Sequence, residues 1–314
     1  MICAETVVVI LQFVLIVAIA PLMSGIVSKF KALMQGRIGA SIIQPYRDLA
    51  KLLRKDSVTS RNCSWLFRAV PYVCMVSMLG LAMMVPFFYT GILAPVGGLI
   101  AAVYLMTMFR FAMVLGGLEG GSTFGGMGSS REMMFSVLVE PALLLSIATL
   151  AVLTGSGTDM GEISEVITTL GFTAVGPSLI LAGVSFIITM LAENSRIPFD
   201  NPTTHLELTM IHEAMLLEYS GRGLAFMEFS SMLRLTVFMA LISSMFFPWG
   251  ISTTLGAEDL IIGLAVVIVK MVLVAFLLSA IESALCKSRL FKAPNLLTVS
   301  FALSLLAMIA LYIL

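Results

Sequence analysis

Long hydrophobic stretches alternate with shorter charged segments along almost the whole chain of 314 residues. Between its charged residues the sequence leaves stretches of about 20 apolar residues, the length that an α-helix needs to cross a hydrocarbon core of about 30 Å. Backbone groups find no water there, so the pattern predicts an all-α polytopic membrane protein. Eight transmembrane helices are expected, at about 6–27, 69–89, 98–118, 133–154, 177–192, 235–248, 260–281 and 294–314. The sixth is short, and its helix is expected to begin earlier, near Ser231.

The charges segregate when eight spans alternate across the bilayer. The connections at about 28–68, 119–132, 193–234 and 282–293 hold sixteen of the eighteen Lys and Arg residues. The other two, Arg110 and Lys270, fall inside spans, and the opposite side carries acidic residues only. Basic connections tend to stay in the cytoplasm. We therefore expect a single transmembrane domain over residues 1–314, with both termini on the non-cytoplasmic side.

The composition adds two constraints. Apolar residues make up 59% of the chain and charged residues only 11%, which excludes a soluble domain that covers itself with charge. The four cysteines form no CxxC pair or other spacing that holds zinc, nickel or an iron-sulfur cluster. No metal or cofactor is therefore expected in this chain.

The first apolar stretch is too long for the core of a signal peptide and lacks a basic start, so we expect it to persist as a helix.

Two cytoplasmic connections have distinctive patterns. In the first, leucines alternate with basic residues at helical spacing: Leu49, Leu52 and Leu53 against Arg47, Lys51, Arg54 and Lys55. This pattern is typical of an amphipathic helix at the cytoplasmic membrane surface, and a basic loop that only enforces topology explains it equally well. The second, at 119–132, is rich in glycine but matches no nucleotide-binding loop. Its small residues allow the close approach of a docking subunit, or form a flexible turn.

Arg110 and Lys270 are charged residues inside predicted spans, where an unpaired charge costs at least about 3 kcal/mol. Such residues are functional hypotheses by default and are expected to have a charged partner. Glu140, in the fourth predicted span, is the expected counter-charge for both. We favour a role in proton transfer over a static ion pair that only holds helices together.

The connection at 193–234 concentrates acidic residues among apolar ones. Its stretch from 193 to 221 has five carboxylates, which belong to Glu193, Asp200, Glu207, Glu213 and Glu218. Mutual repulsion and partial burial raise carboxylate pKa values toward neutrality, and the interleaved leucines and methionines indicate a folded segment instead of a solvated loop. We predict that this connection handles protons. His205 and His212 form no HExxH zinc motif, so proton exchange or a subunit contact is favoured over a metal site.

Two motifs in this connection carry a resemblance to a known family. Glu193, Arg196, Pro198, Phe199 and Asp200 match an E-x-x-R-x-P-F/V-D motif, and residues 218–221 match E-Y-S/A-G. The chain resembles the H-type subunit of respiratory complex I and the equivalent membrane subunit of energy-converting group 4 nickel-iron hydrogenases of the formate hydrogenlyase type. The first cytoplasmic loop, and Arg131 followed by Glu140, also resemble this family. The run with two histidines between the motifs resembles the hydrogenase branch.

The resemblance implies a membrane-anchor and ion-translocation-coupling subunit of a redox-driven hydrogenase complex, without a cofactor or activity of its own. Its partners would be hydrogenase large and small subunits and iron-sulfur subunits, which carry the nickel-iron centre and the clusters, together with antiporter-like membrane subunits and the lipid bilayer, but no nucleic acid. The expected location is the cytoplasmic membrane of a bacterium or archaeon. The residues expected to couple proton or sodium movement are Arg110, Arg131, Glu140, Glu193, Arg196, Asp200, Glu207, His212, Glu213, Glu218, Lys270 and Glu282.

Three alternatives remain compatible with the sequence. The first is a quinone-site subunit of a complex I-type quinone oxidoreductase, in which the first cytoplasmic loop and the acidic connection line a quinone chamber. The second is a self-sufficient secondary transporter, although the sequence shows neither inverted repeats nor paired broken helices. The third is a passive anchor whose buried charges only hold helices together.

Overall fold

The computed structural model describes residues 2–60, 63–90, 98–171, 176–200, 210–252, 256–288 and 292–313. Within these ranges the chain is helical and contains no β-strand. The long helices are α1 (Ile2–Met34), α3 (Trp65–Met84), α4 (Leu99–Glu119), α5 (Thr123–Thr154), α7 (Pro177–Glu193), α9 (Gly221–Leu241), α10 (Ala257–Ala284) and α11 (Ala293–Ile313). The shorter ones are α2 (Gln44–Arg54), α6 (Met160–Leu170), α8 (His212–Leu216) and the π-helical turn η3 (Ile242–Phe246), which continues α9.

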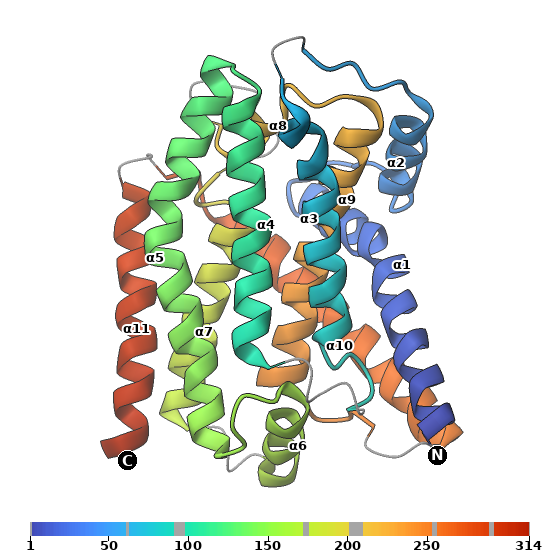
Figure 1. The fold of residues 1–314 in the computed structure, drawn as a ribbon. Helices are drawn as coiled ribbons and strands as arrows, with labels where there is room; N and C mark the ends of the chain where they lie inside the picture. The colour runs from blue at the N-terminus through green and yellow to red at the C-terminus, as the bar shows by residue number, and fades with distance from the viewer. Residues whose placement is uncertain are drawn as a thin grey trace.

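The long helices form one bundle (Figure 1). On one side α11 packs against α5 and α7, and on the other α1 packs against α9 and α10. The two groups are joined by α3 and α4, which pack against each other: α3 also contacts α9, and α4 also contacts α5. Both chain termini and α6 lie at one end of the bundle, and α2 and α8 lie at the other (Figure 1). The termini thus share one end, as an even number of crossings requires.

Among the described residues, seven helices are long and apolar enough to cross a membrane: α1, α3, α4, α5, α9 with its continuation, α10 and α11. These helices indicate a multi-pass membrane protein. The remaining candidate, α7, has 17 residues, which corresponds to about 26 Å at 1.5 Å per residue. The count of eight spans and the side that each end faces therefore stay predictions.

Several helices extend beyond the predicted spans. α5 begins at Thr123 and α9 at Gly221, so much of the two connections predicted at 119–132 and 193–234 is helical. The expected early start of the sixth helix is confirmed, and it lies earlier than Ser231. The predicted boundary was wrong because it was placed at Arg234, whereas the bundle buries this arginine inside α9 at 1% exposure.

The predicted amphipathic helix in the first connection exists as α2. It packs against α1 and α9, with Leu49 buried and Leu53 exposed. Pro45 stands in its first turn, and Lys51 and Arg54 in its last turn face the negative end of the helix dipole. The helix therefore attaches to the bundle by one narrow apolar stripe.

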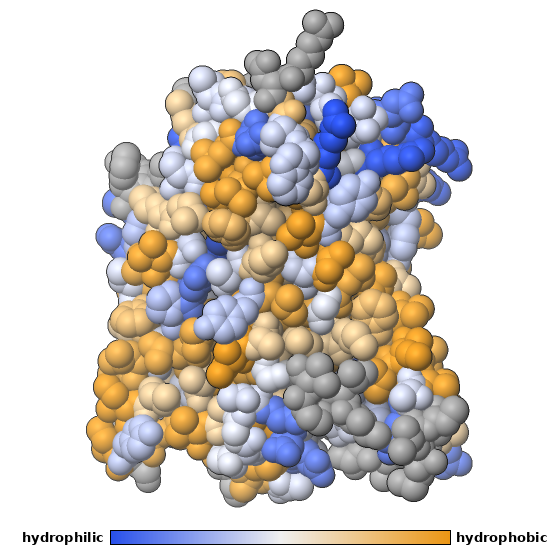
Figure 2. Space-filling model, in the orientation of Figure 1, coloured by the Kyte–Doolittle hydropathy of each residue, from blue (hydrophilic) through white to orange (hydrophobic). Residues whose placement is uncertain are grey.

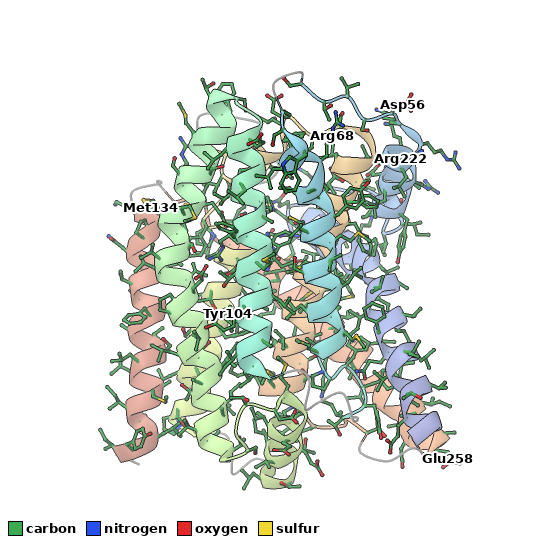
Figure 3. The ribbon with its side chains drawn as sticks, viewed as in Figure 1. Asp56, Arg68, Tyr104, Met134, Arg222 and Glu258 are labelled. Atoms are coloured by element: carbon green, nitrogen blue, oxygen red, sulfur yellow. The ribbon has the colours of Figure 1, made fainter. Side chains whose placement is uncertain are left out.

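The two ends of the bundle differ in polarity. Hydrophilic residues gather at the end that carries α2, whereas hydrophobic residues cover much of the middle and lower parts of the visible face (Figure 2). Arg68 and Arg222 lie at the α2 end, and Glu258 lies at the opposite end (Figure 3). This distribution agrees with the charge segregation that the sequence predicts.

Glycines on α4 and α5 make room for α8. A Cβ atom at Gly128 would lie 2.7 Å from the Ile211 carbonyl oxygen and 3.0 Å from the Ala214 Cβ. A Cβ at Gly117 would lie 2.9 Å from the Met215 Cγ. The glycine-rich segment thus admits α8 of the same chain, and the predicted flexible turn is instead the first turns of α5.

Replacing Gly128 with Ala is expected to push α8 away from α5 and to destabilise the folded protein by about 1–3 kcal/mol, because an added methyl group in a tightly packed site forces its neighbours to shift. Thermal unfolding of the purified protein would measure this as a lower Tm. The matched control is Gly126→Ala on the same helix, where an added Cβ meets no atom within 4 Å. Equal Tm values for the two variants would contradict the conclusion that Gly128 makes room for α8.

Candidate functional site

Arg110 stands at the centre of a buried network of carboxylates. Its Nε lies 3.2 Å from Glu132 Oε1 and its Nη1 lies 3.1 Å from Glu140 Oε1, while its Nη2 pairs with Glu193 Oε1. The arginine comes from α4, Glu132 and Glu140 come from α5, and Glu193 ends α7. One guanidinium therefore ties three helices together.

The network reaches from the protein interior to its surface. Arg110, Glu132 and Glu193 are almost completely buried, whereas the Glu140 side chain is 32% exposed. Ser136 lies one turn from each of the two α5 carboxylates and donates a hydrogen bond of 2.6 Å to Glu140 Oε1. Because positions four residues apart share a helix face, Glu132, Ser136 and Glu140 form one polar stripe along α5.

A second group of ion pairs surrounds the segment that follows α7. Glu282 of α10 is fully buried and pairs with Lys31 at 2.9 Å and with Arg196 at 3.1 Å. Asp200 pairs with Lys287 at 2.7 Å and accepts a hydrogen bond of 3.0 Å from the Ile211 backbone N–H. These contacts hold both ends of the segment between α7 and α8 against α1 and α10.

A cavity of about 620 Å³ lies next to the second group, and one of its lining residues, Asn194, directly follows Glu193 of the first group. It is bounded by the last turns of α1, the segment after α7, α8 and α9. Its charged lining residues are Lys31, Arg37, Arg196, Asp200, Glu213 and Glu228, and His212 also borders it. Serines of α1 and α9 complete a lining that can hold ordered water.

Arg234 and His212 form a third polar element between the cavity and the Arg110 network. Arg234 Nη2 lies 3.4 Å from His212 Nε2, and its guanidinium stacks over the Phe109 ring at 4.7 Å. Both residues are buried. Burial, with the nearby positive charges of Arg234 and Arg110, lowers the pKa of His212 well below its ordinary value. Burial thus favours the neutral form of the His212 ring.

The structure brings together most of the residues expected from the sequence. Arg110, Glu140 and Glu193 meet in one network, and Arg196 meets Glu282 in the other. Arg131 supports the site from α5, since its Nη1 donates a hydrogen bond of 2.8 Å to the Met210 carbonyl. Glu213 is half-buried and faces the cavity.

Two of the expected residues that the structure describes, Lys270 and Glu218, do not join these networks. Lys270 was expected to pair with Glu140, but its ammonium donates a hydrogen bond of 2.6 Å to the Phe247 carbonyl. The expectation failed because Lys270 lies on α10, which packs against α1 and α9 and not against α5. Glu218 is exposed. Glu207, like His205, lies outside the described residues.

The sequence interpretation missed Glu132 and Arg234. Glu132 was placed at the end of a connection, although its spacing of four and eight residues from Ser136 and Glu140 indicates one helix face. Arg234 was placed in the cytoplasm because it interrupts the hydrophobic run before the sixth predicted span. Only packing shows that it faces the interior.

No group of three or more metal-binding side chains occurs within the part of the chain that the structure describes. The described cysteines, Cys63, Cys74 and Cys286, are all free. The expectation that redox centres reside on other subunits stays a prediction.

The chain has close relatives among known membrane proteins. Residues 6–313 match the family model described as NADH dehydrogenase. The chain belongs to this family. Within it, the chain is 35% identical to "Hydrogenase-4 component C" of Escherichia coli (strain K12), with 94% of this chain and 92% of that protein covered. It is 34% identical to "Formate hydrogenlyase subunit 4" of the same organism, with 96% and 97% covered.

More distant relatives belong to the same NADH dehydrogenase family. The H-type subunit of the NADH-quinone oxidoreductase of Rubrobacter xylanophilus is 28% identical, with 74% of this chain and 71% of that protein covered. In fold, the chain is similar to a chain of the membrane-bound sulfane sulfur reductase, an archaeal respiratory membrane complex, with a TM-score of 0.81, 19% identity and 96% and 99% coverage. The predicted resemblance to complex I and formate hydrogenlyase is thus confirmed.

Replacing Arg110 with Met is expected to destabilise the protein by about 3–5 kcal/mol, because it leaves buried carboxylates without their shared counter-charge. The Tm and the yield of the purified protein would both fall. Arg110→Met combined with Glu193→Gln is expected to recover part of the loss, since one buried negative charge is then removed. Arg222→Met, at an exposed position on α9, is the control, and equal losses in both single variants would contradict the assignment.

Proposed function

We propose that this chain is the membrane-anchor and ion-coupling subunit of a membrane-bound nickel-iron hydrogenase complex. In this role it links a peripheral redox arm to antiporter-like membrane subunits. The observation that carries the proposal is the buried network of carboxylates around Arg110, which ends at the partly exposed Glu140 and whose Glu193 directly precedes a residue that lines the cavity, Asn194. The similarity to hydrogenase-4 component C and formate hydrogenlyase subunit 4 over nearly the whole chain supports the hydrogenase assignment.

The cavity would serve as the entrance for protons. Acidic and basic side chains line it together, and Glu213 and Glu228 are placed to exchange protons with water inside it. From there the path would lead through the buried carboxylates around Arg110. Glu140 would be its exit, because it is the member of the network that reaches the surface of the bundle.

Coupling would arise from movement of the segment between α7 and α9. Salt bridges of Arg196 and Asp200 fix one part of it, and Arg131 fixes another through the Met210 carbonyl. Glu193 lies at the start of this segment and also belongs to the Arg110 network. A partner that shifts the segment during its redox reaction would therefore change the distance between Glu193 and Arg110. That distance sets which carboxylate holds a proton.

The cavity lining suits a hydrated path. Ion-paired and hydroxyl side chains line the space together with apolar ones such as Ile197, Leu216 and Met232, so water has polar partners there. The redox centres of the complex, namely the nickel-iron site and iron-sulfur clusters, would reside on the partner subunits. The assembly would lie in the cytoplasmic membrane of a bacterium or archaeon.

Gentle detergent purification of the tagged chain from its native membrane tests the assignment of the complex. Nickel, iron and hydrogen-uptake activity are expected to co-purify with the chain. Co-purification of quinone reductase activity without nickel would indicate instead that the chain is a subunit of a complex I-type quinone oxidoreductase. Transport by the chain purified alone would favour a self-sufficient transporter.

Glu140→Gln tests the coupling path itself. The amide keeps the size of the side chain but cannot carry a proton, so we expect proton translocation to fall at least about tenfold while the complex still assembles. Translocation is measured in proteoliposomes as the pH change per hydrogen-linked turnover. Glu258→Gln, an exposed acid at the start of α10 at the opposite end of the bundle (Figure 3), is the matched control. An unchanged pH change per turnover in Glu140→Gln would refute the path through Arg110.

A further inference from the structure

Arg234 is a buried cation with unused hydrogen-bonding capacity. It is 1% exposed, and its Nε and Nη1 find no hydrogen-bond partner among the described residues. Its two described contacts are the 3.4 Å approach to His212 Nε2 and the Phe109 ring. Buried donors without a protein partner generally bind ordered water. Arg234 is therefore the least firmly held member of the buried charge groups.

The contact with Arg234 fixes the tautomer of His212. A guanidinium only donates hydrogen bonds, so His212 Nε2 must accept, and the proton of the neutral ring must reside on Nδ1. Nδ1 is buried and also lacks a partner among the described residues. Because the ring borders the cavity, this N–H can be satisfied by water at the cavity edge.

We propose that Arg234 acts as a gate that controls proton transfer through His212, between the cavity and the buried carboxylates Glu132 and Glu193. This inference rests on the proposed function and adds to it the residues that open and close the path. In the closed state the Arg234 guanidinium donates a hydrogen bond to His212 Nε2. The imidazole can then take up no proton on the side that faces the arginine.

The gate opens when the guanidinium leaves Nε2. Arg234 lies within electrostatic reach of Glu132 and Glu193, which otherwise share Arg110. Loss of the Arg110 contact by Glu193, as the segment after α7 moves, would attract Arg234 to that carboxylate. Nε2 can then receive a proton from a carboxylic acid of the network through the waters beside Arg234, while Nδ1 gives its proton to cavity water. One proton crosses from the network to the cavity, and the ring ends as the other tautomer. In the reverse sequence cavity water protonates Nδ1 and Nε2 gives its proton to a carboxylate, which carries a proton from the cavity to the network, as the proposed path requires, and returns the ring to the closed-state tautomer.

Removal of the gate is expected to cause a leak that depends on His212. Arg234→Met keeps a side chain of similar length and frees Nε2, so proteoliposomes with the idle complex should lose a pH gradient several-fold faster than wild type, measured with an internal pH dye. Arg234→Met combined with His212→Gln should return the leak to the wild-type rate, because an amide relays no proton. A leak that persists in the double variant would indicate damaged packing and overturn the proposal.

His212→Gln alone tests the relay and does not depend on whether an Arg234 variant assembles. Its expected result is a loss of proton translocation of at least about tenfold in the assembled complex. Glu258→Gln, at an exposed position at the opposite end of the bundle, should translocate at the wild-type rate. His212→Ala should regain translocation when imidazole is added, because the small base can enter the cavity; a packing defect would not respond in this way.

The outcomes separate the gate from the proposed function. Normal translocation in His212→Gln together with a loss in Glu140→Gln would overturn the gate and leave the coupling path in place. Normal translocation in both variants would overturn both. Loss in both variants, a leak in Arg234→Met that His212→Gln suppresses, and rescue by imidazole would together support the gate.

Discussion

The charge of Arg110 cannot lie inside the bundle without neighbours that neutralise it, and this constraint organises the site. A buried ion loses several kcal/mol of hydration, which only close and well-placed counter-charges offset. Glu132, Glu140 and Glu193 meet this need from two different helices. The rotation and depth of α4, α5 and α7 are therefore linked, and a shift of any one of them disturbs the charge balance of all three.

Glu193 connects this network to the cavity side of the bundle. It belongs to the buried network and stands directly before residues 194–200, which border the cavity and form salt bridges through Arg196 and Asp200. The glycines at positions 117 and 128, on α4 and α5, let α8 lie close enough to bring His212 beside Arg234. Packing at this end of the bundle thus brings buried charge close to a cavity that can hold water.

Membership of the NADH dehydrogenase family gives this arrangement a context. The relatives that cover nearly the whole chain are named as components of hydrogenase-4 and formate hydrogenlyase, and a fold relative belongs to an archaeal respiratory complex. These relatives differ in the chemistry that their names give, yet each is similar to this chain over nearly its whole length.

The sequence by itself determined the membrane fold and the segregation of charge, and it placed Arg110 and Glu140 inside spans, where a charge needs a partner. These features follow from local composition and helical spacing, because membrane thickness and helix periodicity act directly on neighbouring residues. The tertiary structure alone decided that Arg234 is buried, that Glu132 and Glu193 share one arginine, and that Lys270 lies apart from them. Which charges meet depends on how helices rotate and pack against each other, and residues distant along the chain set that arrangement.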